Sequence, residues 1–324
     1  MKVVYNSRIE PADISYISDK FPELDFVLTY GPDDVARELG DAEIMFVSNR
    51  VYVEDMVAAV NANAGNLKLI HFTTSGIDKA LKSGGFPAHV TVANVAGLRG
   101  PTLAEHAFAL LLFLAHRFRA VEAARQSHSW QREEITPTIA SLKGQTLVVI
   151  GMGATGQSMA KKARAFDMRV IGVSRAYEPD DLVEEVFPRE RVTEALAQAD
   201  AVLMSMPSTA ETRGFLDAEK FAAMKPGAFV INVARGDLID EDDLIAACQS
   251  GTIGGAGLDV TAEEPTPADS ALWDVENIVL SPHVGGGGGG PEDTALDELL
   301  IENLRLYLAG KPLKRLVDWR NMAV

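Results

Sequence analysis

One segment in the middle of the chain constrains the fold most, because it joins two apolar runs through a glycine-rich turn. It reads LVVIGMGATGQSMAKKARAFDMRVIGVSR, from Leu147 to Arg175. Its first run is typical of a buried strand, the small residues after the glycines are typical of a helix, and a second apolar run follows. A strand, a turn, a helix and a strand in this order predict a βαβ unit with parallel strands.

The turn carries glycines at the spacing G-x-G-x-x-G, at Gly151, Gly153 and Gly156. In this context the first glycine permits a tight turn, the second lets a pyrophosphate approach the backbone, and the third allows close packing of helix and strand. The following helix offers unpaired N–H groups and a positive dipole end to phosphates. A tight turn without a ligand is the alternative, and we favour a dinucleotide-binding turn.

Short apolar runs alternate with helical patterns along nearly the whole chain. We expect strands at 2–5, 44–47, 67–72 and 90–94, and a second series at 146–150, 170–173, 201–205, 228–233, 254–259 and 278–281. Apolar strands separated by helix-length segments indicate parallel sheets with helices on both faces. We predict an α/β fold of two doubly wound, Rossmann-like parallel-sheet domains, with the active site in the cleft between them.

The expected domain boundaries follow from the segments between and after these two series. A long apolar helix from about 102 to 126, opened by Pro101, separates them and should be buried at a domain junction or between subunits. A final helix is expected at 291–310, returning to the first lobe. We assign a discontinuous substrate-binding domain to residues 1–98 plus 285–324. We assign a dinucleotide-binding domain to residues 99–284.

Charge and cysteine content restrict partners and location. The 324 residues include 46 acidic and 30 basic side chains, and the net charge of −16 argues against nucleic acid or an anionic membrane as partner. The single cysteine, Cys248, cannot form an internal disulfide, which fits a reducing compartment. The N-terminus reads as a strand, and the longest apolar stretch, 108–115, is too short to span a bilayer. We expect a cytoplasmic protein.

The end of the second strand of the βαβ unit bears on the choice of dinucleotide. NAD sites place Asp or Glu there, accepting hydrogen bonds from the ribose 2′-hydroxyl. This chain has Ser174 and Arg175 instead, and a hydroxyl beside a guanidinium suits a 2′-phosphate that a carboxylate would repel. Glu178 is near enough in sequence to keep NAD(H) possible, and a solvated surface charge is the other interpretation of Arg175. We predict that NADP(H) is preferred.

Three charged or titratable residues follow expected strands of the second series. Arg235 follows the strand in FVINVARGDLID, Glu264 follows the one in GGAGLDVTAEEP, and His283 follows the one in NIVLSPHVGG. Ligands of open α/β sheets bind outside the carboxyl ends of the strands. Each residue alone has a common structural interpretation, whereas the three in this order favour a catalytic set. No metal-ligand spacing appears, so we predict no metal.

Longer stretches add a specific resemblance. LKGQTLVVIGMGATG, MPSTAETRGFLDAEKFAAMKPGAFVINVARGDLIDEDDLIAA, GGAGLDVTAEEP and LWDVENIVLSPHVGG occur in this order, with TTSGIDKA and TLAEHAFALLL upstream. Over almost its full length the chain resembles the D-isomer-specific 2-hydroxyacid dehydrogenase family, in particular glyoxylate/hydroxypyruvate reductases. Together with the expected NADPH use, the resemblance implies reduction of glyoxylate, hydroxypyruvate or a similar short 2-oxo acid to the D-2-hydroxy acid. It also implies a homodimer, which the apolar helix at 102–126 favours.

The resemblance implies roles for individual residues. Arg235 would bind and polarise the 2-oxo acid, His283 would be the acid/base, and Glu264 would support the histidine. The cofactor site would comprise Thr102, Gly151, Met152, Gly153, Ala154, Thr155, Gly156, Ser174, Arg175, Met206, Pro207, Thr212, Val233, Ala234, Asp259 and Gly285. The substrate side would comprise the backbone of Ser75, Gly76 and Ile77, with Arg50 either contacting a second anionic group or facing solvent.

The chemistry requires these residue types in its own right. Negative charge develops on a ketone oxygen when hydride adds to its carbon, and histidine, which titrates near neutrality, can deliver a proton there. A carboxylate such as Glu264 favours the imidazolium and orients the ring. Arg235 offers a planar fork to a carboxylate and positive charge to the oxyanion. His71, His89, His106, His116 and His128 have no such context and are expected to be structural or exposed.

After His283 the chain departs from the family pattern. Family members usually continue with one or two glycines, whereas six run from Gly285 to Gly290 here. We expect a wall behind His283 that continues into a flexible connection, and a roomier, less discriminating pocket.

Other functions share this fold. Formate dehydrogenases resemble the pattern with Gln in place of Glu264, and phosphoglycerate or phosphonate dehydrogenases would act on another acid. A corepressor-like protein would bind dinucleotide without turnover. The natural substrate stays open at this stage.

Overall fold

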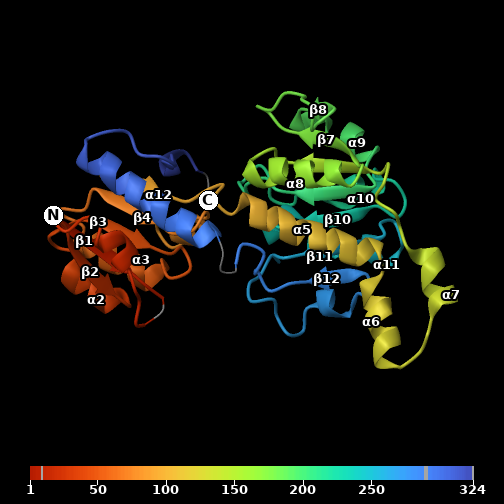
Figure 1. Cartoon of the computed structure of the whole chain (residues 1–324), viewed down its shortest axis with the longest axis horizontal. Coiled ribbons are helices and arrows are strands. Elements are labelled where there is room, and N and C mark those ends of the chain that lie inside the picture. Colours follow the sequence, from red (N-terminus) through yellow and green to blue (C-terminus); the bar gives the residue numbers. More distant parts are fainter. Residues whose placement is uncertain (9, 288–290, 323–324) are drawn as a thin grey trace. The chain divides into compact units, whose positions relative to one another are not determined.

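The computed structural model describes residues 1–8, 10–287 and 291–322 of the chain. These divide into two compact units, Met1–Leu98 with Gly289–Val324, and Arg99–Gly288 (Figure 1). Each unit is built around its own parallel sheet, and every pairing between neighbouring strands is parallel. The predicted α/β fold with two doubly wound parallel sheets is confirmed.

The described part of the first unit has strands in the order β2-β1-β3-β4-β5. The strands are β1 Lys2–Asn6, β2 Asp25–Thr29, β3 Ala42–Val47, β4 Leu69–Phe72 and β5 Thr91–Ala93; the helices are α1 Ser15–Ser18, α2 Pro32–Glu38, α3 Glu54–Asn63, α4 Asp78–Lys82 and α12 Pro291–Leu308. Because side chains alternate along a strand, Val3 and Val4 enter cores on opposite faces of the sheet. Leu300 and Leu304 of α12 pack in the same core as Val3.

The second unit has the strand order β12-β11-β10-β9-β6-β7-β8. The strands are β6 Thr146–Ile150, β7 Arg169–Val173, β8 Glu185–Phe187, β9 Ala201–Met204, β10 Phe229–Asn232, β11 Gly255–Leu258 and β12 Ile278–Leu280; the helices are α5 Gly100–Ala115, α6 Phe118–Gln126, α7 Arg132–Ile135, α8 Ala154–Ala165, α9 Val192–Leu196, α10 Ala218–Ala222 and α11 Glu241–Gln249. Buried side chains of α5 and α8 cover one face of the sheet, and those of α9, α10 and α11 cover the other.

The predicted single helix over 102–126 is wrong. Helix α5 ends at Ala115, Arg117 adopts a left-handed backbone with φ of 54°, and α6 begins at Phe118. The apolar residues explain the break, because those of α5 are buried against the sheet whereas α6 buries only Ala124. The apolar run therefore ends where the chain leaves the core.

Two strands, β2 and β8, were not expected from the sequence. Both lie at the edge of their sheet, where one side of the strand has no strand partner, and their side chains are mostly half-buried. The apolar run is short in both strands, FVL in β2 and VF in β8, and neither strand has the buried pattern of a strand covered on both faces. Within the described residues, no helix is long and apolar enough to cross a membrane.

Candidate active site

The glycine-rich turn after β6 has the geometry of a phosphate site. Gly151 has φ of +103°, and a Cβ there would lie 2.7 Å from the Met206 nitrogen. A Cβ on Gly156 would lie 2.1 Å from the Gly151 carbonyl oxygen, so the first and third positions admit only glycine. Among the described residues, no atom beyond its own chain neighbours lies within 4 Å of the Cβ position of Gly153, which caps the N-terminus of α8. Open space beside a helix N-terminus fits a dinucleotide pyrophosphate.

Hydrogen bonds fix the backbone around this turn. The Ser205 hydroxyl donates to the Gly151 carbonyl at 2.7 Å, and the Gln157 amide donates to the Met152 carbonyl at 2.9 Å. The Met152 side chain is buried in the core, which leaves its backbone for any cofactor contact. Thr212 is also buried, and its hydroxyl donates to the Pro207 carbonyl at 2.9 Å, so it shapes the loop after β9.

The other predicted cofactor residues lie in the same unit. They follow β6, β9 and β10 or stand in the first turns of α5 and α8: Thr102, Ala154, Thr155, Met206, Pro207, Val233 and Ala234. Gly100 of α5 packs so closely on α8 that an added Cβ would lie 2.9 Å from the Ala154 carbonyl carbon. The start of α5, which carries Thr102, is thus held against the start of α8.

The end of β7 carries the residues expected to select the dinucleotide. The Ser174 hydroxyl accepts a hydrogen bond from the Ala176 nitrogen at 3.3 Å. Arg175 pairs with Glu211 at 3.2 Å, and Arg189 pairs with the same carboxylate at 2.8 Å. Neither Arg189 nor Glu211 is marked by the sequence. Arg189 follows the unexpected strand β8, and Glu211 is brought near only by the folding of the loop after β9.

His283 and Glu264 are held together at the carboxyl ends of β12 and β11. The imidazole Nδ1 and the carboxylate Oε2 are 2.7 Å apart. His283 has a left-handed backbone with φ of 54°, and its nitrogen donates to the Asp259 carbonyl at 2.9 Å. Partial burial raises the pKa of Glu264, but the hydrogen bond and positive charge of His283 outweigh it and hold that pKa below its usual value.

Arg235 belongs to the same constellation. The amide of the buried Asn232 donates to the Arg235 carbonyl at 2.8 Å and accepts from the Ala234 nitrogen at 3.0 Å, which fixes the turn after β10. Gly236 packs directly on the loop after β11, where a Cβ would lie 1.9 Å from the Thr261 carbonyl carbon. The charge of Arg235 also contributes to the lowered pKa of Glu264. The structure therefore brings the three predicted residues together within one unit.

A buried carboxylate organises the backbone behind His283. Asp259 accepts hydrogen bonds from the Ser281 hydroxyl at 2.6 Å and from the nitrogens of Val284 and Gly285, each at 2.9 Å. His106 of α5 lies 2.7 Å from the Ser281 hydroxyl and 3.2 Å from Asp259. His106, which was expected to be structural or exposed, is half-buried in this network, whereas Ser281 was not expected to take part. The only signal was their position in the stretches TLAEHAFALLL and LSPHVGG.

Gly285 offers a direct test of this network. A Cβ there would lie 2.7 Å from the Asp259 carboxylate and 2.9 Å from the His106 ring, whereas one on Gly286 would lie 3.8 Å from its nearest neighbour. We expect Gly285→Ala to lower the free energy of unfolding by about 1–3 kcal/mol, as overpacking does, and Gly286→Ala to leave it almost unchanged. Urea unfolding measures both, and equal stabilities for the two variants would contradict this packing. Gly288–Gly290 lie outside the described residues.

The pair of His283 and Glu264 predicts a pH-dependent contribution to stability. Because the folded pKa of Glu264 is lowered, its contribution is complete above the ordinary glutamate value of 4.5 and is lost as the pH falls through the folded value. We expect the melting temperature of the wild type to exceed that of Glu264→Gln at neutral pH, and the difference to shrink at acidic pH. The neighbouring exposed Glu263→Gln is the control, and a difference independent of pH would refute the ionised pair.

The predicted substrate-side residues lie in the first unit, after β3 and β4. The Asn94 amide donates to the Ser75 carbonyl at 2.7 Å, and the Asn49 nitrogen donates to the Thr74 hydroxyl at 3.1 Å, which joins the two loops. Ile77 is buried, Gly76 is half-buried and Arg50 is exposed.

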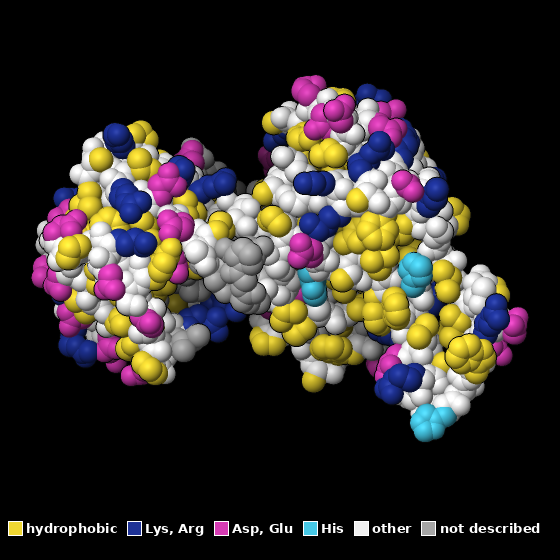
Figure 2. Space-filling view, viewed as in Figure 1, with side chains coloured by type: hydrophobic (Ala, Val, Ile, Leu, Met, Phe, Trp, Pro, Cys, Tyr) yellow, Lys and Arg dark blue, Asp and Glu magenta, His cyan; other side chains and the backbone are white. Residues whose placement is uncertain are grey.

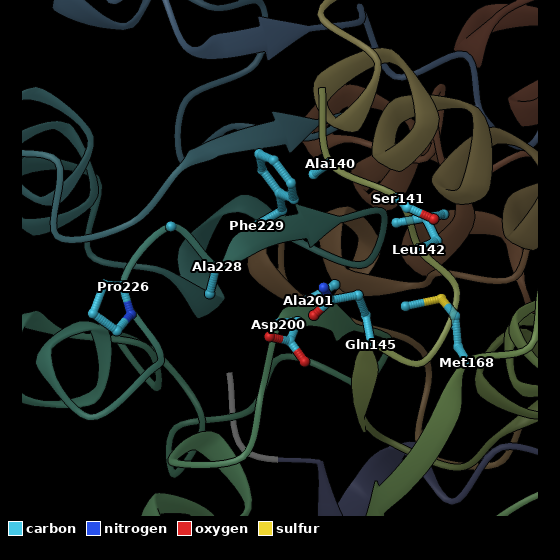
Figure 3. Close-up of a pocket in the computed structure, with 11 residues that line it drawn as sticks. Ala140, Ser141, Leu142, Gln145, Met168, Asp200, Ala201, Pro226, Ala228 and Phe229 are labelled. Carbon is cyan, nitrogen blue, oxygen red and sulfur yellow. The ribbon is translucent and has the colours of Figure 1, made fainter. Parts of the chain in front are cut away.

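A separate cavity of about 150 Å³ opens at the amino ends of the strands in the second unit's sheet (Figure 3). Gln145, Asp200 and Phe229 line it at the amino ends of β6, β9 and β10. The Asp200 carboxylate accepts hydrogen bonds from the Thr146 nitrogen and from Lys225, both at 2.8 Å. Its charge is balanced by these donors, and the cavity lies at the opposite strand ends from the glycine-rich turn.

The strand order, the glycine-rich turn and the three residues at strand ends define the class of dinucleotide-dependent α/β oxidoreductases. A family model described as "D-isomer specific 2-hydroxyacid dehydrogenase, NAD binding domain" matches residues 108–285. The chain belongs to the D-isomer-specific 2-hydroxyacid dehydrogenase family.

Individual relatives cover almost the whole chain. A glycerate dehydrogenase of Methylorubrum extorquens is 31% identical over 96% of this chain and 97% of its own. A structure of a D-isomer-specific 2-hydroxyacid dehydrogenase family protein from Aeromonas salmonicida has a TM-score of 0.85 at 28% identity, covering 98% of this chain and 99% of that one. An NADPH-dependent glyoxylate/hydroxypyruvate reductase from Sinorhizobium meliloti, solved with NADP and sulfate, has a TM-score of 0.81 at 25% identity and covers 98% of both chains.

Proposed function

We propose that the protein reduces a short 2-oxo acid, such as glyoxylate or hydroxypyruvate, to the 2-hydroxy acid with NADPH as reductant, giving the D isomer where the product is chiral. The contact of 2.7 Å between His283 and Glu264, with Arg235 close enough to act on the same carboxylate, carries this proposal. The Sinorhizobium relative is named for this reaction with NADPH, and the Methylorubrum relative is named for glycerate, the product of hydroxypyruvate reduction.

The residues of the second unit suit this chemistry. Bound NADPH supplies the hydride that adds to the keto carbon. The turn at Gly153 and the N-terminus of α8 hold the pyrophosphate. Since Nδ1 of His283 faces Glu264, its Nε2 remains to give a proton to the keto oxygen. Arg235 binds the substrate carboxylate through its planar fork and stabilises the charge that develops on that oxygen.

The domain roles are part of the proposal. We infer that residues 1–98 with 285–324 bind the substrate and that residues 99–284 bind the dinucleotide. The backbone of Ser75–Ile77 would receive the substrate carboxylate, and Arg50, which is exposed, would contact a second anionic group.

A panel of 2-oxo acids assayed with NADPH and with NADH tests the proposed function. We expect the highest kcat/KM for glyoxylate or hydroxypyruvate, and a higher value with NADPH than with NADH. Better turnover of a phosphorylated oxo acid would assign a phosphoglycerate-type enzyme, and oxidation of formate with NAD would assign a formate-type enzyme. Tight dinucleotide binding with negligible turnover of every acid would point to a corepressor-like protein.

We also propose that the protein is a homodimer through α5, α6 and the segment after them. Large apolar side chains are exposed there, including Phe118 at 49%, Val121 at 40% and Trp130 at 91%. Figure 2 shows hydrophobic side chains gathered over this side of the second unit. An apolar face of this kind is typical of subunit contacts. Sedimentation velocity is expected to give twice the chain mass, and Trp130→Asp to raise the dimer dissociation constant; a monomeric wild type would refute the proposal.

A further inference from the structure

We propose that Arg175 and Arg189 together form the site for the 2′-phosphate of NADP(H), and that Glu211 occupies this site when no nucleotide is bound. Glu211 thereby limits the preference for NADPH over NADH. This inference rests on the proposed function, because it concerns the nucleotide that the enzyme uses.

The two arginines hold equivalent positions at the ends of neighbouring strands. Val173 of β7 pairs with Phe187 of β8, and each arginine follows its strand residue by two positions. The Ser174 nitrogen donates to the Phe187 carbonyl at 3.0 Å, which continues the pairing beyond the strands. Both arginines therefore lie at the carboxyl ends of the strands. Nucleotides of doubly wound folds bind at these ends, next to the glycine-rich turn after β6.

Glu211 reaches this pair from the other side of β6. It lies in the loop after β9, and β9 and β7 flank β6 in the sheet. The same oxygen, Oε2, lies 3.2 Å from Nη2 of Arg175 and 2.8 Å from Nη2 of Arg189. One anionic oxygen between two guanidinium groups is the arrangement that a phosphate oxygen would adopt there. Glu211 thus stands in for the 2′-phosphate.

The charges at this site decide between the two nucleotides. Hydrogen bonds from Arg189 and then Arg175 hold the pKa of Glu211 below its usual value, so its carboxylate is ionised at neutral pH. A 2′-phosphate carries nearly two negative charges, and the carboxylate repels it and competes for the same donors. The side chains of Glu211 and Arg175 are 68% and 63% exposed, so Glu211 can turn into water at modest cost.

NADH places a neutral hydroxyl at the same position. A hydroxyl needs no pair of guanidinium groups, and a carboxylate is the partner that NAD sites use for it. Removal of the negative charge at Glu211 should therefore favour NADPH and not NADH. This difference separates competition for the phosphate site from a general effect on nucleotide binding.

Dissociation constants for NADPH and NADH, measured by nicotinamide fluorescence, test the inference without turnover. We expect Glu211→Gln to tighten NADPH binding by about 1.5- to 5-fold, the range for an exposed charge pair, and not to tighten NADH binding. Arg189→Gln is expected to weaken NADPH binding by at least that factor and to leave NADH binding unchanged. Glu184→Gln is the matched control. Glu184 also bridges two arginines, Arg164 and Arg169, but it lies at the amino ends of the strands, away from the nucleotide.

Two results would overturn the inference. One is that Glu211→Gln binds NADPH no more tightly than the wild type, and the other is that it binds both nucleotides more tightly by the same factor. A wild type that binds no NADPH would support the inference if the variant does bind it, and would overturn it if the variant does not. Failure of the wild type to reduce 2-oxo acids would defeat the proposed function alone, since the binding measurement needs no substrate.

Discussion

Replacement of His283 by Asn is expected to lower kcat for glyoxylate or hydroxypyruvate by a factor of about 10²–10⁴, the usual contribution of a positioned acid/base. Asn retains a polar side chain but cannot hand over a proton at neutral pH. The Asp259 network that holds this segment uses backbone nitrogens and the Ser281 hydroxyl, not the imidazole. NADPH binding should therefore stay close to that of the wild type.

The measurement pairs steady-state NADPH oxidation with nucleotide titration by fluorescence. His116→Asn provides a matched control, because His116 is exposed and follows the last residue of α5. Turnover of the His283 variant at the rate of the wild type would remove this residue from the acid/base role. Loss of nucleotide binding along with turnover would instead point to a structural role.

Arg235→Lys is expected to cause the second large loss of activity. A lysine keeps the charge but loses the planar fork that binds a carboxylate through two parallel hydrogen bonds. We expect kcat/KM to fall by about 10²–10³, the cost of removing one donor to a developing oxyanion. The loss should appear in KM as well as in kcat, because the same group binds the substrate and stabilises the charge that develops during the reaction.

Arg305→Lys serves as the control, because Arg305 is an exposed residue in the last turn of α12, in the other unit. A 2-oxo aldehyde that lacks the carboxylate extends the test, since its turnover should fall less in the Arg235 variant than that of glyoxylate. If both substrates lost turnover equally, Arg235 would not be the carboxylate-binding group.

The parts of the fold predicted from sequence are those where burial leaves a simple pattern. β6 and the turn at Gly151 were expected at their observed positions, because a strand covered on both faces is apolar throughout. The edge strands β2 and β8 lack that pattern and were missed. The break at Arg117 was also missed, because a helical pattern of residues does not indicate where the chain leaves the core.

The residues of the site likewise fall into those that could be predicted from the sequence and those that could not. Arg235, Glu264 and His283 could be expected together because each follows a strand of one parallel sheet, and such strands end at one edge. Arg189 and Glu211 could not, since their meeting depends on a strand of three residues and on a loop conformation. The contact of His106 with Ser281 could not be expected for a similar reason, because α5 brings the two residues together across 175 positions of the chain.

The proposed reaction depends most on His283 and Glu264 acting as one unit, and a double-mutant cycle on kcat tests this directly. The variants are His283→Asn, Glu264→Gln and the double variant, each with NADPH and the best oxo acid of the panel. If Glu264 acts only through the imidazole, the double variant is expected to be no slower than His283→Asn alone. Losses that multiply, as for independent residues, would contradict the pairing on which the proposed reaction rests.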